Sequence, residues 1–469
     1  MSFASLDFGI FAVLFYLLYA LFGFRRPALY MALFSLFFYG WWDFRYLPLL
    51  IASAIVDFYA GKAIHKSQSK RVRKLWLLGS VTLNIGALVF FKYWNFFATE
   101  VQRTASLDIF VHDLILPLGL SFYTLQTLGY SIDVYRRKLE PEQNFLTYLL
   151  FVSFFPQLIA GPIERAGKLL PQLKALKNIT FSNFRAGFLI ALWGLFIKLA
   201  VADNIGGFVQ DAFSTTSAGF LFWGVCVTAM FQVYCDFYAY TLIARGLAKG
   251  IGVSLSENFR QPFFAKNLTE FWQRWHITLT RWILDYVHIP LARRYRWEPM
   301  RSLVAIGAMC LVGLWHGASW NFILFGVFHG VVLRLWTPTS RLLRRTVHNE
   351  TVAAISSRVV LIAVLSLSAP MFLIQDMDQV LTVIQGLFSF ESGWETLKPA
   401  PNKVRYIWGC VLAIFVITND ILIRRDSSIQ VEQVATGPMG RAILYGCILI
   451  TMIVLFGNLE GFEFVYFQF

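Results

Sequence analysis

Two histidines in apolar surroundings are the residues of this sequence that are best suited to catalysis. His276 lies in NLTEFWQRWHITLTRWILDYVHIPL, residues 267–291, and His316 lies in GLWHGASWNFILFGVFHG, residues 313–330. A neutral imidazole can take a proton from an attacking hydroxyl when its pKa is near the working pH. The alternative is a structural histidine that hydrogen-bonds a neighbouring helix, and this applies more strongly to His329.

The segment that carries His276 has the pattern of an amphipathic helix. Asn267 stands at the N-cap position with Glu270 three residues later, which marks a helix start, and Pro290 ends or kinks the helix. One apolar face is formed by Phe271, Trp272, Trp275, Leu279, Trp282 and Tyr286. The helix either lies in the membrane interface or dips inward and presents His276 and Asp285 to a cavity, and the periodicity fits both.

The composition indicates a polytopic membrane protein. The chain has 469 residues, of which 57% are hydrophobic and 14% are charged, against about 25% charged in a typical soluble domain. Repeated apolar runs are too numerous for one buried core. The candidate membrane segments are 8–24, 28–42, 47–62, 76–97, 114–134, 186–203, 219–247, 302–315, 319–335, 357–375, 406–423 and 442–458.

The positive charge reports topology rather than binding of nucleic acid. The formal net charge is +14, and basic clusters occur at 62–74, 136–138, 165–185 and 341–345. Basic loops of membrane proteins stay in the cytosol and contact lipid headgroups. With these clusters inside, both termini are expected on the outer, periplasmic side.

Two irregular segments interrupt the expected single membrane domain, residues 1–469, of about 10 to 12 transmembrane segments. Residues 145–161 are apolar enough to cross, but a crossing would place the basic stretch 165–185 outside. A re-entrant segment broken at Pro156 resolves this conflict. Residues 250–300 form a second, cytosolic insert of amphipathic or re-entrant character.

Several ordered motifs resemble the membrane-bound O-acyltransferase superfamily, and more closely its alginate O-acetyltransferase branch. The motifs are LPLGLSFYTLQTLGYSIDVYR (116–136), FFPQLIAGPIER (154–165), YCDFYAY (234–240), ENFRQPF (257–263), the two histidine segments and the terminal VYFQF. The resemblance runs nearly end to end. It implies an all-α fold in which a ring of tilted transmembrane helices with re-entrant segments surrounds a central funnel open to the cytosol.

The resemblance also implies a reaction and its residues. The catalytic histidine of the family maps onto His316, the second polar position maps onto His276, and Asp285 follows in the DY pair. The implied donor is cytosolic acetyl-CoA. The implied partner is an SGNH-type acetyltransferase in the periplasm or anchored to the membrane, within an exopolysaccharide machinery of the bacterial inner membrane.

Further residues are expected to support this reaction, each with a plainer alternative. Arg260, Lys266, Arg274 and Arg281 could attract the phosphates of acetyl-CoA, or could report topology and contact lipid. Asp236 needs a partner at membrane depth, with Arg245 or a tyrosine as candidates. Tyr466 could relay an acyl group, or could belong to an aromatic belt. The five cysteines show no metal-ligand spacing, so no metal site is expected.

Two classes of protein compete with the acyltransferase hypothesis. A secondary transporter would show inverted repeats and paired broken helices, and the sequence shows neither. A non-catalytic scaffold of a polysaccharide secretion complex would make His316 dispensable. The preferred hypothesis is O-acetylation of an exopolysaccharide, alginate or cellulose.

Overall fold

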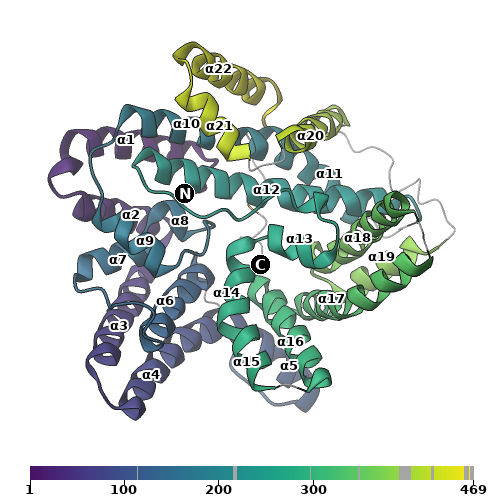
Figure 1. Cartoon of the computed structure of the whole chain (residues 1–469), viewed down its shortest axis with the longest axis horizontal. Helices are drawn as coiled ribbons and strands as arrows, with labels where there is room; N and C mark the ends of the chain where they lie inside the picture. The colour runs from purple at the N-terminus through teal and green to yellow at the C-terminus, as the bar shows by residue number, and fades with distance from the viewer. Residues whose placement is uncertain are drawn as a thin grey trace. The chain divides into compact units, whose positions relative to one another are not determined.

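The computed structural model describes residues 1–112, 115–214, 219–295, 297–346, 349–389, 403–423, 427–458 and 464, and these ranges contain helices but no strand (Figure 1). Within these ranges, six helical runs are long and apolar enough to cross a bilayer, which confirms the expected all-α polytopic membrane protein. The six runs are Pro27–Lys66, Lys70–Ala105, Phe181–Ser214, Glu298–His316, Glu350–Leu373 and Met439–Phe456.

Some of the expected membrane segments appear as shorter apolar helices. Four such helices of 10 to 17 residues are Leu6–Phe22, Phe145–Leu158, Trp320–Trp336 and Arg405–Thr418. Three of them correspond to the expected segments 8–24, 319–335 and 406–423. The number of crossings, about 10 to 12, stays a prediction, because length and composition alone select only the six longer runs.

The chain divides into two compact units. The first comprises Met1–Ala191, Tyr240–Ser256 and Ala435–Pro438, and the second comprises Leu192–Ala239, Glu257–Val434 and Met439–Phe469. The helices that lie wholly in the first unit are α1 Leu6–Phe22, α2 Pro27–Asp43, α3 Leu47–Lys66, α4 Lys70–Leu88, α5 Trp94–Ala105, α6 Leu120–Tyr135, α7 Phe145–Ser153, α8 Phe155–Leu158 and α9 Ala166–Lys174. Helices α10 (Phe181–Phe196) and α12 (Phe222–Gly250) contribute to both units.

A buried polar network joins α3, α4 and α6 in the first unit. Ser80 Oγ donates to Asp57 at 2.5 Å, and Asn84 Nδ2 donates to both Asp57 oxygens at 3.0 and 2.9 Å. Ser131 also donates to this carboxylate. A carboxylate in a candidate membrane span is therefore satisfied by protein donors, as membrane depth requires.

The segment 145–161 is broken at Phe154, two residues before the predicted position at Pro156. Helix α7 ends at Ser153, Phe154 takes a non-helical conformation, and Pro156 falls in the first turn of α8. Residues 147–164 are all buried. Irregular backbone is tolerated at membrane depth where protein covers it. The burial of residues 147–164 is therefore compatible with a helix break at this point. The re-entrant placement of this segment stays a prediction.

The second unit contains the two histidine segments. Its helices are α11 Asp203–Ser214, α13 Leu268–Arg274, α14 Ile277–Ile283, α15 Ile289–Arg294, α16 Glu298–His316, α17 Trp320–Thr346, α18 Glu350–Leu373, α19 Met377–Leu387, α20 Lys403–Ile423 and α22 Met439–Phe456, with α21 (Ser427–Thr436) at its boundary. The wider π-helical turns η4 (Ile197–Ala202) and η6 (Leu284–His288) continue α10 and α14.

Glycines let α16 and α17 pack closely. A Cβ at Gly313 would lie 2.0 Å from the carbonyl oxygen of Phe322. A Cβ at Gly326 would lie 2.4 Å from the carbonyl oxygen of Met309. Neither position has room for a side chain, since real Cβ atoms do not approach backbone so closely. The two helices form a tight hairpin that begins its turn directly after His316.

The expected single helix over residues 268–290 is wrong. Helix α13 ends at Arg274, and α14 begins at Ile277. Between them His276 has left-handed backbone angles, φ 41° and ψ 53°. The predicted start at Asn267 is confirmed, because its side chain accepts the backbone N–H of Glu270. Periodicity missed the break, since the apolar spacing continues across it.

Asn258 stabilises this break from the preceding loop. Its carbonyl accepts the N–H of Ile277 at 2.9 Å, and its side-chain oxygen accepts the Thr278 hydroxyl at 2.6 Å and the Thr278 N–H at 3.3 Å. These bonds satisfy donors at the start of α14 that a helix otherwise leaves unpaired. The unfavourable left-handed conformation of a non-glycine residue persists because surrounding contacts hold it.

We expect Asn258→Ala to lower the free energy of unfolding by about 1–3 kcal/mol, because it leaves buried donors of α14 without an acceptor. The measurement is the thermal unfolding midpoint of the purified protein in one detergent. Thr278→Val removes one of the two side-chain bonds and should cost less. An unchanged midpoint for Asn258→Ala would show that the break does not depend on this side chain.

Candidate functional site

His316 is the last residue of α16 and is buried in an aromatic environment. Its side chain is 3% exposed. The imidazole centroid lies 5.1 Å from the Phe372 ring of α18 and 6.3 Å from the Phe325 ring of α17. Three helices therefore enclose this histidine.

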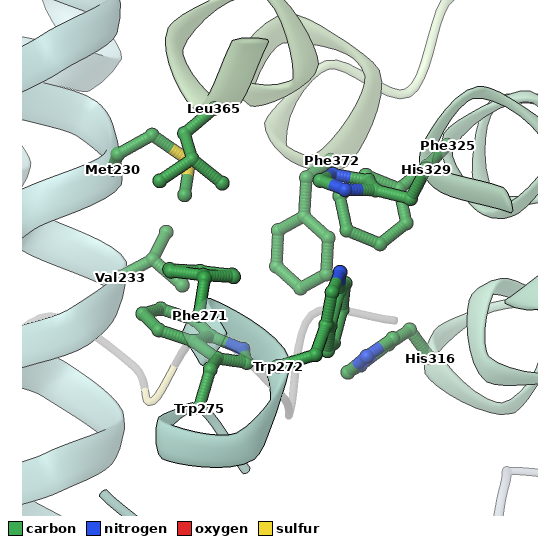
Figure 2. A pocket seen from close by; sticks show the side chains of 10 residues that line it. All are labelled: Met230, Val233, Phe271, Trp272, Trp275, His316, Phe325, His329, Leu365 and Phe372. Atoms are coloured by element: carbon green, nitrogen blue, oxygen red, sulfur yellow. The ribbon is translucent and has the colours of Figure 1, made fainter. Parts of the chain in front are cut away.

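The His316 side chain borders a small apolar cavity of about 20 Å³. Figure 2 shows ten side chains around it, which are Met230, Val233, Phe271, Trp272, Trp275, His316, Phe325, His329, Leu365 and Phe372. They come from α12, α13, α16, α17 and α18, and Trp275 directly follows α13. One water needs about 10–15 Å³ by this measure, so the cavity holds one small group.

The helix break brings His276 beside His316. The two imidazole centroids are 6.2 Å apart, and both rings contact Trp315, at 5.3 and 5.1 Å. His276 is 1% exposed and also packs against Phe237 of α12. Burial lowers the pKa of His276 to about 3, so its imidazole is neutral at physiological pH. The burial of His276 agrees with an inward-facing side chain.

Asp285, in contrast, is exposed on η6 and does not line the cavity. The hypothesis that this segment presents His276 and Asp285 to a cavity therefore fails for Asp285, whereas His276 is buried beside His316 without lining the cavity. The reason is the break, because the segments before and after His276 no longer follow one helical periodicity. Tyr466 lies outside the described residues. Phe464 is buried, and its ring lies 5.8 Å from that of Phe237.

The four basic candidates lie outside the cavity. Arg260 forms an ion pair with Glu257 at 2.5 Å, and Arg274 forms one with Glu270 at 2.6 Å. Lys266 and Arg281 are exposed. The Arg260 pair joins two residues three positions apart in the loop before α13.

Asp236 has a partner that the sequence analysis did not identify. The ammonium of Lys198 on η4 lies 2.6 Å from Asp236 and 2.7 Å from Asp203, and all three side chains are 1% exposed. Arg245 or a tyrosine was expected instead. A lysine within the apolar run 186–203, with an aspartate five residues later, was the signal for this buried group.

This arrangement can support proton transfer at a small, apolar site. Two buried imidazoles lie together, and one of them borders a cavity that accepts a single small group. An apolar, water-poor environment strengthens electrostatic interactions with a reacting group. Among the described residues, no group of three or more His, Cys, Asp or Glu side chains could hold a metal ion.

Residues missed by the sequence analysis complete the site. Asn258 fixes the break, and Phe325 and Phe372 form much of the wall around His316. Phe325 was detectable, because it lies in the same segment as His316. The contribution of Phe372 had no local signal, because α18 reaches the cavity only through tertiary packing.

Comparison with known proteins gives the family. The model of the membrane-bound O-acyltransferase family matches residues 82–374. The chain is 34% identical to a peptidoglycan O-acetyltransferase of Helicobacter pylori over 393 residues, 77% of this chain and 73% of that protein. It is 34% identical to a probable alginate O-acetylase AlgI of Azotobacter vinelandii over 346 residues, 71% of this chain and 67% of that protein.

A more distant similarity links the chain to a teichoic acid D-alanyltransferase of Bacillus subtilis, with 26% identity over 268 residues, 54% of this chain and 66% of that protein. The names of these relatives all describe acyl transfer, and none describes transport or scaffolding. Since the family match covers more than half of the sequence and includes His276 and His316, the chain belongs to the membrane-bound O-acyltransferase family and is an acyltransferase.

Proposed function

We propose that this protein moves an acetyl group from cytosolic acetyl-CoA across a bacterial inner membrane for O-acetylation of an exopolysaccharide of the alginate or cellulose type. The observation that carries the proposal is the buried His316 at a cavity of about 20 Å³. A cavity with room for about one water favours a short acyl group over a long fatty acyl chain. The alginate O-acetylase relative supports the class of acceptor.

His316 acts as the general base in this proposal. One ring nitrogen takes the proton of the attacking hydroxyl while the hydroxyl oxygen bonds to the thioester carbonyl carbon. The carbon–sulfur bond then breaks, and the proton passes from His316 to the departing thiolate. His276 is the second imidazole of the pair, and its neutral ring helps to hold His316 through their shared contact with Trp315.

The basic residues are proposed to attract the donor. Lys266 and Arg281 are exposed and able to meet the phosphates of acetyl-CoA. Arg260 and Arg274 are already paired with glutamates, so their contribution to a phosphate site is smaller. Asp236 supports the fold through Lys198 rather than the chemistry. Asp285 is exposed, and its proposed supporting role is therefore at the protein surface.

Delivery to the polymer is proposed to use an SGNH-type partner in the periplasm or anchored to the membrane. Both termini of this chain would then be periplasmic, and Tyr466 would either relay the acyl group or anchor the tail in the aromatic belt. The positive-inside distribution of basic loops supports this orientation.

Peptidoglycan is the second candidate acceptor. The peptidoglycan O-acetyltransferase of Helicobacter pylori is similar over a larger share of this chain, 77%, than the Azotobacter relative, 71%. Incubation of the protein and its partner with labelled acetyl-CoA and each polymer in turn distinguishes the two. Label in peptidoglycan but not in alginate or cellulose would replace the exopolysaccharide proposal.

We expect His316→Ala to reduce acetyl transfer by roughly 100- to 10,000-fold, because a general base contributes about that factor. The measurement is transfer of labelled acetyl from acetyl-CoA by the purified protein with its partner. His65→Ala is the matched control, since His65 pairs with the exposed Glu140 and should keep wild-type activity. Undiminished transfer by a well-folded His316→Ala protein would leave the scaffold hypothesis in place.

We expect Phe372→Leu to raise the ratio of propionyl to acetyl transfer by about tenfold, because the smaller side chain widens the cavity beside His316. One methylene in an apolar pocket is worth roughly 10- to 200-fold in specificity. The rates with acetyl-CoA and propionyl-CoA give this ratio. Phe213→Leu changes a buried phenylalanine outside the cavity and should leave the ratio unaltered. An unchanged ratio in Phe372→Leu would argue against this cavity as the acyl site.

A further inference from the structure

The cavity beside His316 has a second polar wall that the proposed mechanism does not use. His329 on α17 and Trp272 on α13 both line it, with side chains 1% and 5% exposed. Their rings meet edge to face with centroids 5.2 Å apart. Figure 2 shows the Trp272 ring edge-on, with its nitrogen at the end nearer to His329.

The nitrogens of this wall lack protein partners. Neither ring nitrogen of His329 nor Nε1 of Trp272 has a hydrogen-bond partner within the described ranges of the chain. Proteins rarely bury a polar atom without a partner, because the desolvation of that atom is then uncompensated. Two such side chains at one cavity indicate a site prepared for a hydrogen-bonding ligand.

The hydrogen-bonding groups of Trp272 and His329 indicate which kind of ligand the cavity would bind. An indole nitrogen is only a donor, and a neutral imidazole has one N–H to donate. Two donors in an apolar, enclosed site suit an oxygen that becomes negatively charged during a reaction. The cavity of about 20 Å³ is large enough for one such oxygen with its immediate neighbours. A bulky or cationic ligand would fit neither the volume nor the donors.

We propose that Trp272 Nε1–H and one N–H of His329 bind the carbonyl oxygen of the acyl group and stabilise the oxyanion of its transfer. The inference rests on the proposed function, in which a thioester is attacked at His316. When the hydroxyl oxygen bonds to the carbonyl carbon, the π electrons of the carbonyl move onto its oxygen, and the two N–H groups donate to it. When the carbonyl re-forms, the carbon–sulfur bond breaks and the thiolate leaves with the proton held by His316.

This assignment gives the two cavity histidines different roles. His316 exchanges a proton with the reacting groups, whereas His329 keeps its N–H and donates a hydrogen bond throughout. Trp272 cannot titrate, so its contribution is independent of pH. The edge-to-face contact between Trp272 and His329, together with the 4.5 Å contact between Phe325 and His329, holds the donors in place before the substrate arrives.

The experiment measures kcat and KM for acetyl-CoA in Trp272→Phe, His329→Leu and His329→Gln, with the complete protein and its partner in nanodiscs. Loss of one such donor should lower kcat by roughly 100- to 1,000-fold. KM should change by less than about threefold, because the charge develops only in the transition state. His329→Gln keeps an N–H donor and should recover about tenfold over His329→Leu.

Trp193→Phe is the matched control for the indole. Trp193 is buried in the same unit, packs against Phe196 and does not line the cavity. It should keep the wild-type kcat. Size-exclusion profiles and unfolding midpoints establish folding for every variant, and Trp272→Phe, which keeps an aromatic ring, decides the case if His329→Leu fails to fold.

The outcomes separate this inference from the proposed function. Wild-type kcat in folded Trp272→Phe and His329→Leu would overturn the carbonyl site while leaving acetyl transfer at His316 intact. A loss confined to KM would also overturn it, because that pattern belongs to ground-state binding. If the wild-type protein transfers no acetyl from acetyl-CoA to any acceptor, the proposed function fails first and the inference falls with it.

Discussion

The close contact between α16 and α17 is the constraint on which the site depends. Gly313 and Gly326 place the two helix backbones against each other, with no space for a Cβ at either position. His316 ends one helix and His329 lies in the middle of the other, so this contact directs both imidazoles to one cavity. A larger residue at either glycine would separate the helices and open the cavity to lipid or water.

A second constraint explains why a membrane protein retains so polar and aromatic a segment at residues 267–291. The segment is not one helix but two, joined at His276 in a left-handed conformation. Asn258 compensates the break with hydrogen bonds to Ile277 and Thr278. Trp272 and Trp275 of the segment line the cavity. Its arginines differ, since Arg274 is paired with Glu270 and Arg281 is exposed. The unfavourable backbone conformation of His276 is maintained by surrounding contacts and places its imidazole beside that of His316.

Two buried charged side chains of this protein, Lys198 and Asp57, are stabilised by ion pairs or hydrogen bonds. Lys198 lies between Asp236 and Asp203, and Asp57 is surrounded by hydroxyl and amide donors. The cavity wall differs, because His329 and Trp272 have buried nitrogens without partners in the described part of the chain. These unpartnered nitrogens come from two helices and line one cavity, and this shared position points to a role in binding.

The sequence alone determined the membrane class, the helical fold and the family, because these depend on composition, motif order and local spacing. It also predicted the helix start at Asn267 and the break near Pro156. Tertiary structure decided the break at His276, the partner of Asp236 and the surface position of Asp285. It also decided that Phe372 and His329 share a cavity with His316. These features arise from contacts between helices far apart in sequence, and such contacts leave no periodicity in any one segment.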